Sequence, residues 1–305
     1  MTLSTHARRG RTHVTGAASA AVRPVLESQR RPARVLAVFP AGIYLEVRTD
    51  LEPSVIAVVT GEGTRLPNSV LLASELPHVT VGDEAAVGDG LIELGRLSLR
   101  ARRWWDPAPP LGRVELSALT GVEGHLAIPV RQAAQNPAQN PARPGAPGSW
   151  PRPGLEGNGA VEMLAGACAR GWLLGAVSAA EQLVGLGPGL TPSGDDVLAG
   201  LLVTLRQLGT ATGVSRAVWL ADWLAATVTY DARTRTTPIS ATLLHCAARG
   251  EACPEVIGVL RGIAGRQPLE PALARLHRLG HTSGADLAQG VAIGLTSVLA
   301  LGGAG

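Results

Sequence analysis

The chain has 305 residues, a length that suits two domains better than one or three. Hydrophobic residues make up 46% of it and charged residues 17%, so the chain can build a sizeable core and is not disordered throughout. Aromatic residues make up only 3%, which argues against a surface that binds nucleic acid by stacking on bases.

The net charge is +3, and every basic side chain other than histidine is an arginine. Without lysine the chain has no pyridoxal phosphate or aldol-type Schiff base and no intact Walker loop. A dinucleotide fingerprint after a strand is also missing, so we expect no NAD, and we expect no haem. The three cysteines, Cys168, Cys246 and Cys253, lack metal-ligand spacing and lie in apolar contexts, which is typical of structural thiols in a reducing cytoplasm.

In chain order, residues 1–33 predict a disordered, arginine-rich tail without the apolar core of a secretory signal. Residues 34–131 contain short β-branched runs separated by turns, which predict an all-β barrel or sandwich. Residues 132–157 hold six prolines and predict a linker or long surface loop. Residues 158–305 have helical periodicity and predict about seven or eight helices. The fold class is therefore α+β.

Several residues predict where the helices begin and end. Ser178 with Glu181 has a capping-box pattern, and Pro238 and Pro254 suit a first helical turn. Gly171, Gly185, Gly209, Gly250, Gly265 and Gly280 are expected at helix ends. The best membrane candidate, residues 290–301, is too short and too rich in Gly, Ser and Thr. We therefore expect no contact with a membrane.

The most informative segment is residues 185–200, where a glycine-rich loop leads into a helix. Ser193 is the expected N-cap, and Asp196 can either reach back to the cap amide or act in a site. Glycines and first-turn amides favour a bound anion. A second carboxylate would repel that anion, so Asp195 is a candidate ligand for Mg²⁺ or for a substrate amide. The alternative is that both aspartates only complement the helix dipole.

Two further segments have related patterns. Residues 280–290 repeat Ser-Gly-x-Asp, so that Ser283, Gly284, Asp286 and Gly290 align with the first segment, and His281 adds a titratable group. This similarity predicts a pseudo-duplicated site. The alternative is that both segments use the same N-capping pattern, which would give the same short similarity.

Residues 231–240 place two arginines and several hydroxyls before a helix start, which favours anion binding over a solvated loop. We expect the helices that begin near Ser193, Pro238 and Ser283 to point their amides into one shared hollow.

Together these segments resemble the AllH-like family. The resemblance rests on residues 187–196, on Ile239-Ser240-Ala241 with Leu244, Ala247 and Gly250, and on residues 280–286. It implies a subunit of a complex that interconverts oxalurate and phosphate with oxamate and carbamoyl phosphate. It also implies FdrA-like and AllG-like partner subunits.

We expect an enzyme subunit that binds small anionic substrates. One alternative is a non-catalytic regulatory subunit for a small carboxylate or nucleotide, and another is a stand-alone hydrolase or kinase-like enzyme that uses Mg²⁺. The candidate catalytic residues are Asp195, Asp196, His281 and Asp286. The candidate substrate-binding residues are Gly187, Gly189, Thr191, Ser193, Gly194, Arg233, Arg235, Thr237, Ser240, Ser283 and Gly284.

Overall fold

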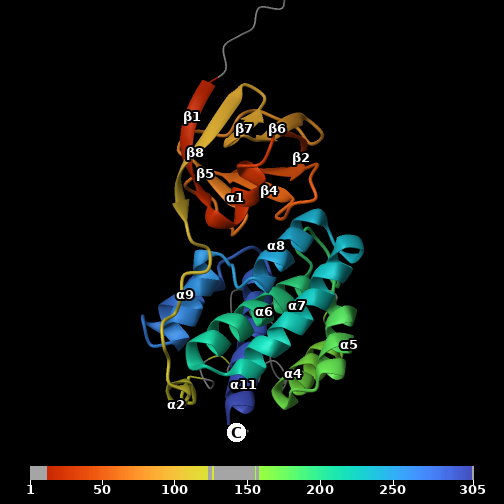
Figure 1. The fold of residues 1–305 in the computed structure, drawn as a ribbon, viewed down its shortest axis with the longest axis vertical. Coiled ribbons are helices and arrows are strands. Elements are labelled where there is room, and N and C mark those ends of the chain that lie inside the picture. Colours follow the sequence, from red (N-terminus) through yellow and green to blue (C-terminus); the bar gives the residue numbers. More distant parts are fainter. Residues whose placement is uncertain (1–11, 123–125, 127–154, 156–157, 304–305) are drawn as a thin grey trace, which may run out of the picture. The chain divides into compact units, whose positions relative to one another are not determined.

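The computed structural model describes residues 12–122, 126, 155 and 158–303. The chain divides after Asp106 into two compact units (Figure 1). The first is a β-barrel and the second is helical, so the predicted α+β class is confirmed.

The first unit is a closed eight-stranded barrel with the strand order β1-β5-β4-β3-β2-β6-β7-β8. β1 pairs in parallel with β8, β4 pairs in parallel with β5, and the other neighbours are antiparallel. A short 3₁₀-helix, η1, and helix α1 follow the first strand. The elements are β1 (Thr12–Ser19), η1 (Ala20–Val22), α1 (Arg23–Leu26), β2 (Arg31–Phe39), β3 (Gly42–Val47), β4 (Val55–Val59), β5 (Ser69–Leu72), β6 (Glu84–Gly88), β7 (Leu91–Leu94) and β8 (Leu97–Trp105).

Buried aliphatic side chains fill the barrel, as expected for a barrel of this size. Ile43, Leu45, Ile56 and Leu72 are among those with almost no exposed surface. The β6–β7 hairpin turns through Asp89-Gly90, where both residues have positive φ angles of 53° and 75°. A two-residue Asp-Gly turn matches the twist of an antiparallel pair.

The barrel begins earlier and ends earlier in the chain than the sequence predicts. Residues 12–33, assigned to a disordered tail, form β1, η1, α1 and the start of β2 instead. β1 pairs along its whole length with β8, from Thr12↔Leu97 to Ser19↔Trp105, and a pairing so distant in sequence leaves little local signal. The first unit ends at Asp106, whereas the prediction extended it to residue 131. Residues 1–11 and most of the predicted linker at 132–157 lie outside the described residues.

The second unit contains eight helices between residues 158 and 303, in agreement with the predicted number. A short helix, α2, precedes them. The helices are α2 (Leu116–Leu119), α4 (Ala160–Arg170), α5 (Leu173–Leu183), α6 (Ser193–Thr212), α7 (Ser215–Arg235), α8 (Pro238–Ala248), α9 (Pro254–Ile263), α10 (Leu269–Leu276) and α11 (Ser283–Gly302).

Most of the predicted helix boundaries are close to those observed. Pro238 and Pro254 are the first residues of α8 and α9. Ser178 is not a cap, because it lies inside α5. Gly209 lies within α6, which ends four residues later at Gly213, where φ is +73°. The helix end predicted at Gly209 is therefore about one turn too early.

Helices α6 and α11 are packed in parallel at the centre of the helical unit. A Cβ at Gly200 would lie 2.3 Å from the Leu287 carbonyl oxygen, and a Cβ at Gly290 would lie 2.1 Å from the Val197 oxygen. Only glycine allows two backbones to approach so closely. The close contact aligns the amino ends of the two helices.

Helix α11 is, among the described residues, the one helix long and apolar enough to cross a membrane by length and composition. In this structure it is a core helix, and 61% of its most apolar window is buried.

Candidate functional site

The three segments singled out in the sequence meet at the amino ends of α6, α8 and α11. The Oγ1 of Thr191 lies 3.1 Å from the Oγ of Ser283, which joins the loop before α6 to the start of α11. The Thr237 hydroxyl donates to the Leu190 carbonyl over 2.6 Å and thereby joins the start of α8 to the same loop. The Thr237 oxygen also accepts from the Ser240 amide, so Thr237 is the N-cap of α8.

Asp195 fixes this arrangement from within. Its carboxylate accepts hydrogen bonds from the Gly185 amide (2.8 Å), the Ser240 hydroxyl (2.6 Å) and the Thr236 hydroxyl. The side chain is 1% exposed. Burial raises the pKa of Asp195, and the three hydrogen bonds oppose that rise. Asp195 therefore connects the end of α5, the end of α7 and the start of α8.

Gly185 makes this connection possible. Its φ angle is +74°, and an added Cβ would lie 2.1 Å from the Arg235 carbonyl oxygen. A side chain at this position would both strain the backbone and push the loop away from the end of α7.

Asp196 and Asp286 occupy the fourth position of α6 and of α11, and both are buried. Burial raises the pKa of Asp196 well above its ordinary value. Hydrogen bonds from Ser283 and Thr191 lower it, while the nearby charges of Asp286 and Asp195 raise it further. The Asp196 Oδ2 atom has no hydrogen-bond partner among the described residues. A carboxyl group in these surroundings tends to hold its proton.

The predicted capping roles are wrong. Helix α6 begins at Ser193 itself, after Pro192, and no side chain caps it. The Asp196 carboxyl interacts instead with hydroxyls from the neighbouring loop and from α11. The parallel contact of α6 with α11 sets this direction, which the sequence around Asp196 does not reveal.

The two repeated helix starts share one backbone design. The Gly194 amide donates to the Leu186 carbonyl, as the Gly284 amide does to that of Leu279. A Cβ on either glycine would lie 2.0–2.1 Å from a carbonyl at the end of the preceding helix. The next two amides in each helix donate to Pro192 and to Thr282. The match ends at the third position, where Asp195 of α6 corresponds to Ala285 of α11.

These backbone bonds change which groups can bind an anion. The first-turn amides of Gly194, Asp195 and Asp196 already have carbonyl partners, so they do not point at a ligand as the sequence suggested. The amides of Gly187, Gly189 and Thr191 make no backbone hydrogen bond to another described residue. Gly187 and Gly189 have φ angles of 117° and 95°. Pro188, which has no amide hydrogen, and Leu190 separate these donors, so they form an alternating rather than a consecutive set.

The remaining candidates lie at the edge of this arrangement. Arg233 and Arg235 are exposed in the last turn of α7 rather than in a loop, and Arg235 pairs with Asp231 at 3.3 Å. His281 is exposed in the loop before α11. Asp195 has its carboxylate occupied by three donors, and no cluster of three or more metal-ligating side chains occurs among the described residues.

One family of known proteins matches this region. Residues 183–295 match the family model described as oxamate carbamoyltransferase subunit AllH. This part of the chain is similar to AllH, and we refer to it as the AllH-like segment. The match runs from the last residue of α5 into α11 and includes all three converging segments. No solved structure matches the chain.

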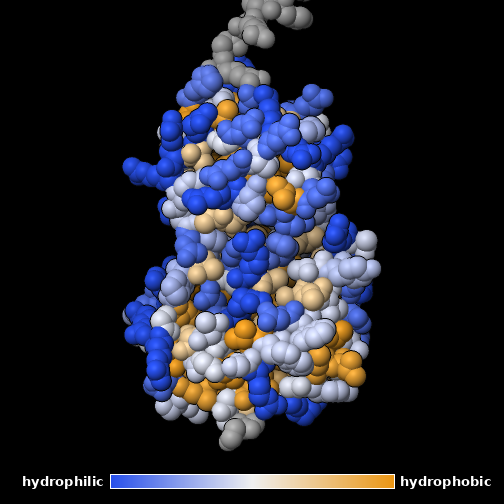
Figure 2. Space-filling model, viewed as in Figure 1, coloured by the Kyte–Doolittle hydropathy of each residue, from blue (hydrophilic) through white to orange (hydrophobic). Residues whose placement is uncertain are grey.

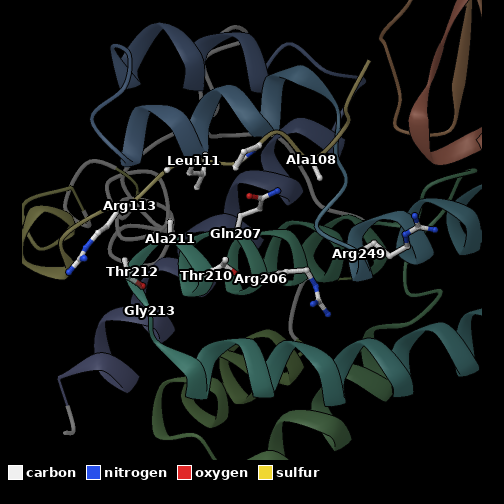
Figure 3. A pocket seen from close by; sticks show the side chains of 12 residues that line it. Ala108, Leu111, Arg113, Arg206, Gln207, Thr210, Ala211, Thr212, Gly213 and Arg249 are labelled. Atoms are coloured by element: carbon white, nitrogen blue, oxygen red, sulfur yellow. The ribbon is translucent and has the colours of Figure 1, made fainter. Parts of the chain in front are cut away.

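Two depressions are lined by other residues of the chain. One, of about 620 Å³, runs along α6 in the helical unit (Figure 3). Its three arginines are spread along the groove and do not converge, and Arg206 and Arg249 are paired with Asp222 at 2.6 Å and Glu251 at 3.0 Å. The other, of about 1020 Å³, belongs to the barrel. Neither depression contains any of the predicted site residues.

Sequence reasoning missed two residues of the AllH-like site. Thr236 donates to Asp195, and Gly185 supplies the amide that binds the same carboxylate. A signal for Thr236 was present, since it precedes Thr237 in a run of hydroxyl residues before Pro238. Gly185 belongs to the glycine-rich segment singled out in the sequence, but it is not among the predicted substrate-binding residues.

Proposed function

We propose that this chain is a subunit of an oxamate carbamoyltransferase complex whose AllH-like segment binds the small anionic reactants. The observation that carries the proposal is that the matched residues 183–295 contain all three helix starts and the contacts that hold them together. The resemblance to this family implies FdrA-like and AllG-like partners, and we propose both.

The groups available to a ligand are hydrogen-bond donors. The amides of Gly187 and Gly189 lie in an exposed loop, and the half-buried hydroxyls of Thr191 and Ser283 lie beside it. Phosphate, carbamoyl phosphate and oxamate are all anions, so donors of this kind suit each of them. Arg233 and Arg235 at the edge would attract such ligands over a longer range.

The buried residues Asp195 and Asp196 would support the site without contacting the ligand directly. Asp195 is a positioning residue, because it sets the loop and the start of α8 and presents no oxygen to a ligand. The raised pKa of Asp196 favours its protonated form, which would not repel an anion above it. Its neighbours Thr191 and Ser283 would connect it to the bound reactants.

This arrangement suits the proton balance of the transfer. A phosphate oxygen attacks the ureido carbonyl of oxalurate, the carbon–nitrogen bond breaks, and carbamoyl phosphate and oxamate leave. The proton that phosphate loses must reach the departing amide nitrogen. A protonated Asp196 can relay it through the two hydroxyls, with the other groups acting by position and charge.

The alternative is a ligand-binding subunit without chemistry of its own, as in a regulatory role for a small carboxylate or nucleotide. Its supporting observation is that Asp195, Asp196 and Asp286 are all less than 10% exposed, so these three carboxyl groups are largely shielded from solvent. Under this alternative a partner subunit performs the transfer, and replacement of Asp196 changes only the response to the ligand.

A thermal-shift series on the purified chain tests the binding site. Oxamate, carbamoyl phosphate, phosphate, ATP and Mg²⁺ are added separately, because a ligand of the folded state at about 100 times its Kd adds about 2.7 kcal/mol of stability. We expect a shift with at least one anion that Ser283→Ala and Thr191→Val abolish. Ser215→Ala removes an exposed hydroxyl at another helix start and should leave the shift unchanged.

Reconstitution with the FdrA-like and AllG-like subunits tests the function. The isolated chain should show no carbamoyl transfer, whereas the complex should. An active complex that becomes inactive with Asp196→Asn supports the relay; unchanged turnover with altered ligand response supports the regulatory alternative. Activity of the single chain would contradict both. A Mg²⁺ requirement and a cytoplasmic location stay predictions.

A further inference from the structure

Helix α7 carries an apolar stripe on the face that it turns away from the core. The stripe consists of Trp219, Trp223, Ala226 and Tyr230, and the four residues are spaced alternately four, three and four apart. Trp219 is 50%, Trp223 51% and Tyr230 78% exposed. In the view of Figure 2, pale and orange surface extends over the part of the helical unit where Figure 1 shows α7.

The stripe does not belong to the face of α7 that packs in the core. The opposite face of α7 is buried through Leu220, Leu224 and Val228, which have almost no exposed surface. Alternation of three and four residues is the spacing of a seam between two packed helices. The chain has only six Trp and two Tyr residues, yet two of the former and one of the latter are in this stripe. Trp, Tyr and Arg are the residues enriched where proteins bind one another.

The same spacing continues to an arginine at each end. Arg216 precedes Trp219 by three residues, and Arg233 follows Tyr230 by three; both are exposed. In the middle the two indole rings already contact each other, with centroids 6.1 Å apart and planes at 62°. The face is therefore preformed, apolar at the centre and positively charged at both ends.

The two arginines distinguish between possible occupants. If a second copy packed antiparallel with its stripe in register, Arg216 of one copy would face Arg233 of the other. If it packed parallel, each arginine would face its own counterpart. Like charges brought together across an interface weaken it. A helix with an apolar seam and acidic residues at both ends would instead complement α7 in either direction.

We propose that the outer stripe of α7 docks such an acidic-ended helix of a different protein subunit. The inference rests in part on the proposed function, because the family description names a subunit. It goes further by locating the contact on the stripe of α7 and the two arginines at its ends, of which Arg233 alone also lies at the edge of the proposed anion site.

The test measures the affinity of the full chain for the purified FdrA-like and AllG-like subunits. Ala226→Glu puts a negative charge in the centre of the stripe without lowering helix propensity, and the double variant R216E/R233E reverses the charge at both ends. Ala274→Glu is the matched control, since Ala274 is an exposed alanine of α10.

We expect Ala226→Glu and R216E/R233E each to weaken the binding of one partner by about 30-fold. Ala274→Glu should bind like the wild type, and wild-type affinity should fall between about 50 mM and about 500 mM salt. Hydroxyl-radical labelling of Trp219, Trp223 and Tyr230 should decrease in the complex.

Three results would overturn the proposal. Equal affinity for Ala226→Glu and Ala274→Glu, in a complex that assembles and is active, would refute the docking surface and leave the proposed function intact. A dimer of the isolated chain that Ala226→Glu dissociates would identify a second copy as the occupant. Failure of the wild-type chain to bind either subunit would refute both proposals. The anion-induced thermal shift, unchanged in Ala226→Glu, shows that the variant is folded.

Discussion

The contact between α6 and α11 makes a sharp prediction for Gly290→Ala. A Cβ at this position would lie 2.1 Å from the Val197 oxygen and 2.8 Å from the Leu201 nitrogen. Ordinary contact begins near 3.4 Å, so the two helices would have to separate by about 1.3 Å. Overpacking of this kind costs about 3 kcal/mol, and alanine returns only about 1 kcal/mol through its higher helix propensity.

We therefore expect Gly290→Ala to lower the free energy of unfolding by about 2 kcal/mol, measured by urea denaturation with far-UV circular dichroism. Gly166→Ala in α4 is the matched control, because its new Cβ would meet only the flexible end of Arg170. That variant should be more stable than the wild type by about 0.5–1 kcal/mol. If the two variants differed by less than about 0.5 kcal/mol, the close packing of α6 on α11 would be wrong.

Three further predictions follow from buried groups. Burial raises the pKa of Asp196 above its ordinary value of 3.8. The protonated side chain therefore contributes fully to the stability of the fold below pH 3.8, and this contribution is lost as the pH rises through the raised pKa. Asp196→Asn should gain stability over the wild type as pH rises from 5 to 8, by at most about 1.4 kcal/mol for each step of one in pH, and a pH-independent difference in urea midpoint would contradict this. Asp195→Asn, which can no longer accept from every donor, should cost about 2 kcal/mol, against about 1 kcal/mol for Ser240→Ala; equal losses in thermal melts would argue against a central role for Asp195. Burial raises the pKa of Cys168 to about 12, so a thiol-reactive dye at pH 8 should label it only after unfolding, as mass spectrometry can show.

Local sequence patterns predicted much of the fold. Short β-branched runs separated by turns, such as the run that forms β4, marked a β unit, and Pro238 and Pro254 marked two helix starts that the structure confirms. β1 was missed because its Gly and Ala residues have weak strand propensity. Its pairing with β8, more than 80 residues away, decides its conformation, and such pairing cannot be recognised from a local window.

The sequence predicted which segments form the site, but it did not predict how their side chains are arranged. The repeated Ser-Gly-x-Asp pattern correctly marked two similar helix starts, at Ser193 and Ser283. The direction of the Asp196 carboxyl depends on how close α6 and α11 approach, and that follows from glycines meeting carbonyls on the other helix.

The duplication in the helical unit is unequal in one respect. Where α6 has Asp195, with its ties to Gly185 and Ser240, α11 has the methyl group of Ala285. One half of the pair is thus anchored through an acid to a third helix, and its twin lacks that acid. The two helix starts therefore follow one backbone plan but are fixed to their surroundings by different means.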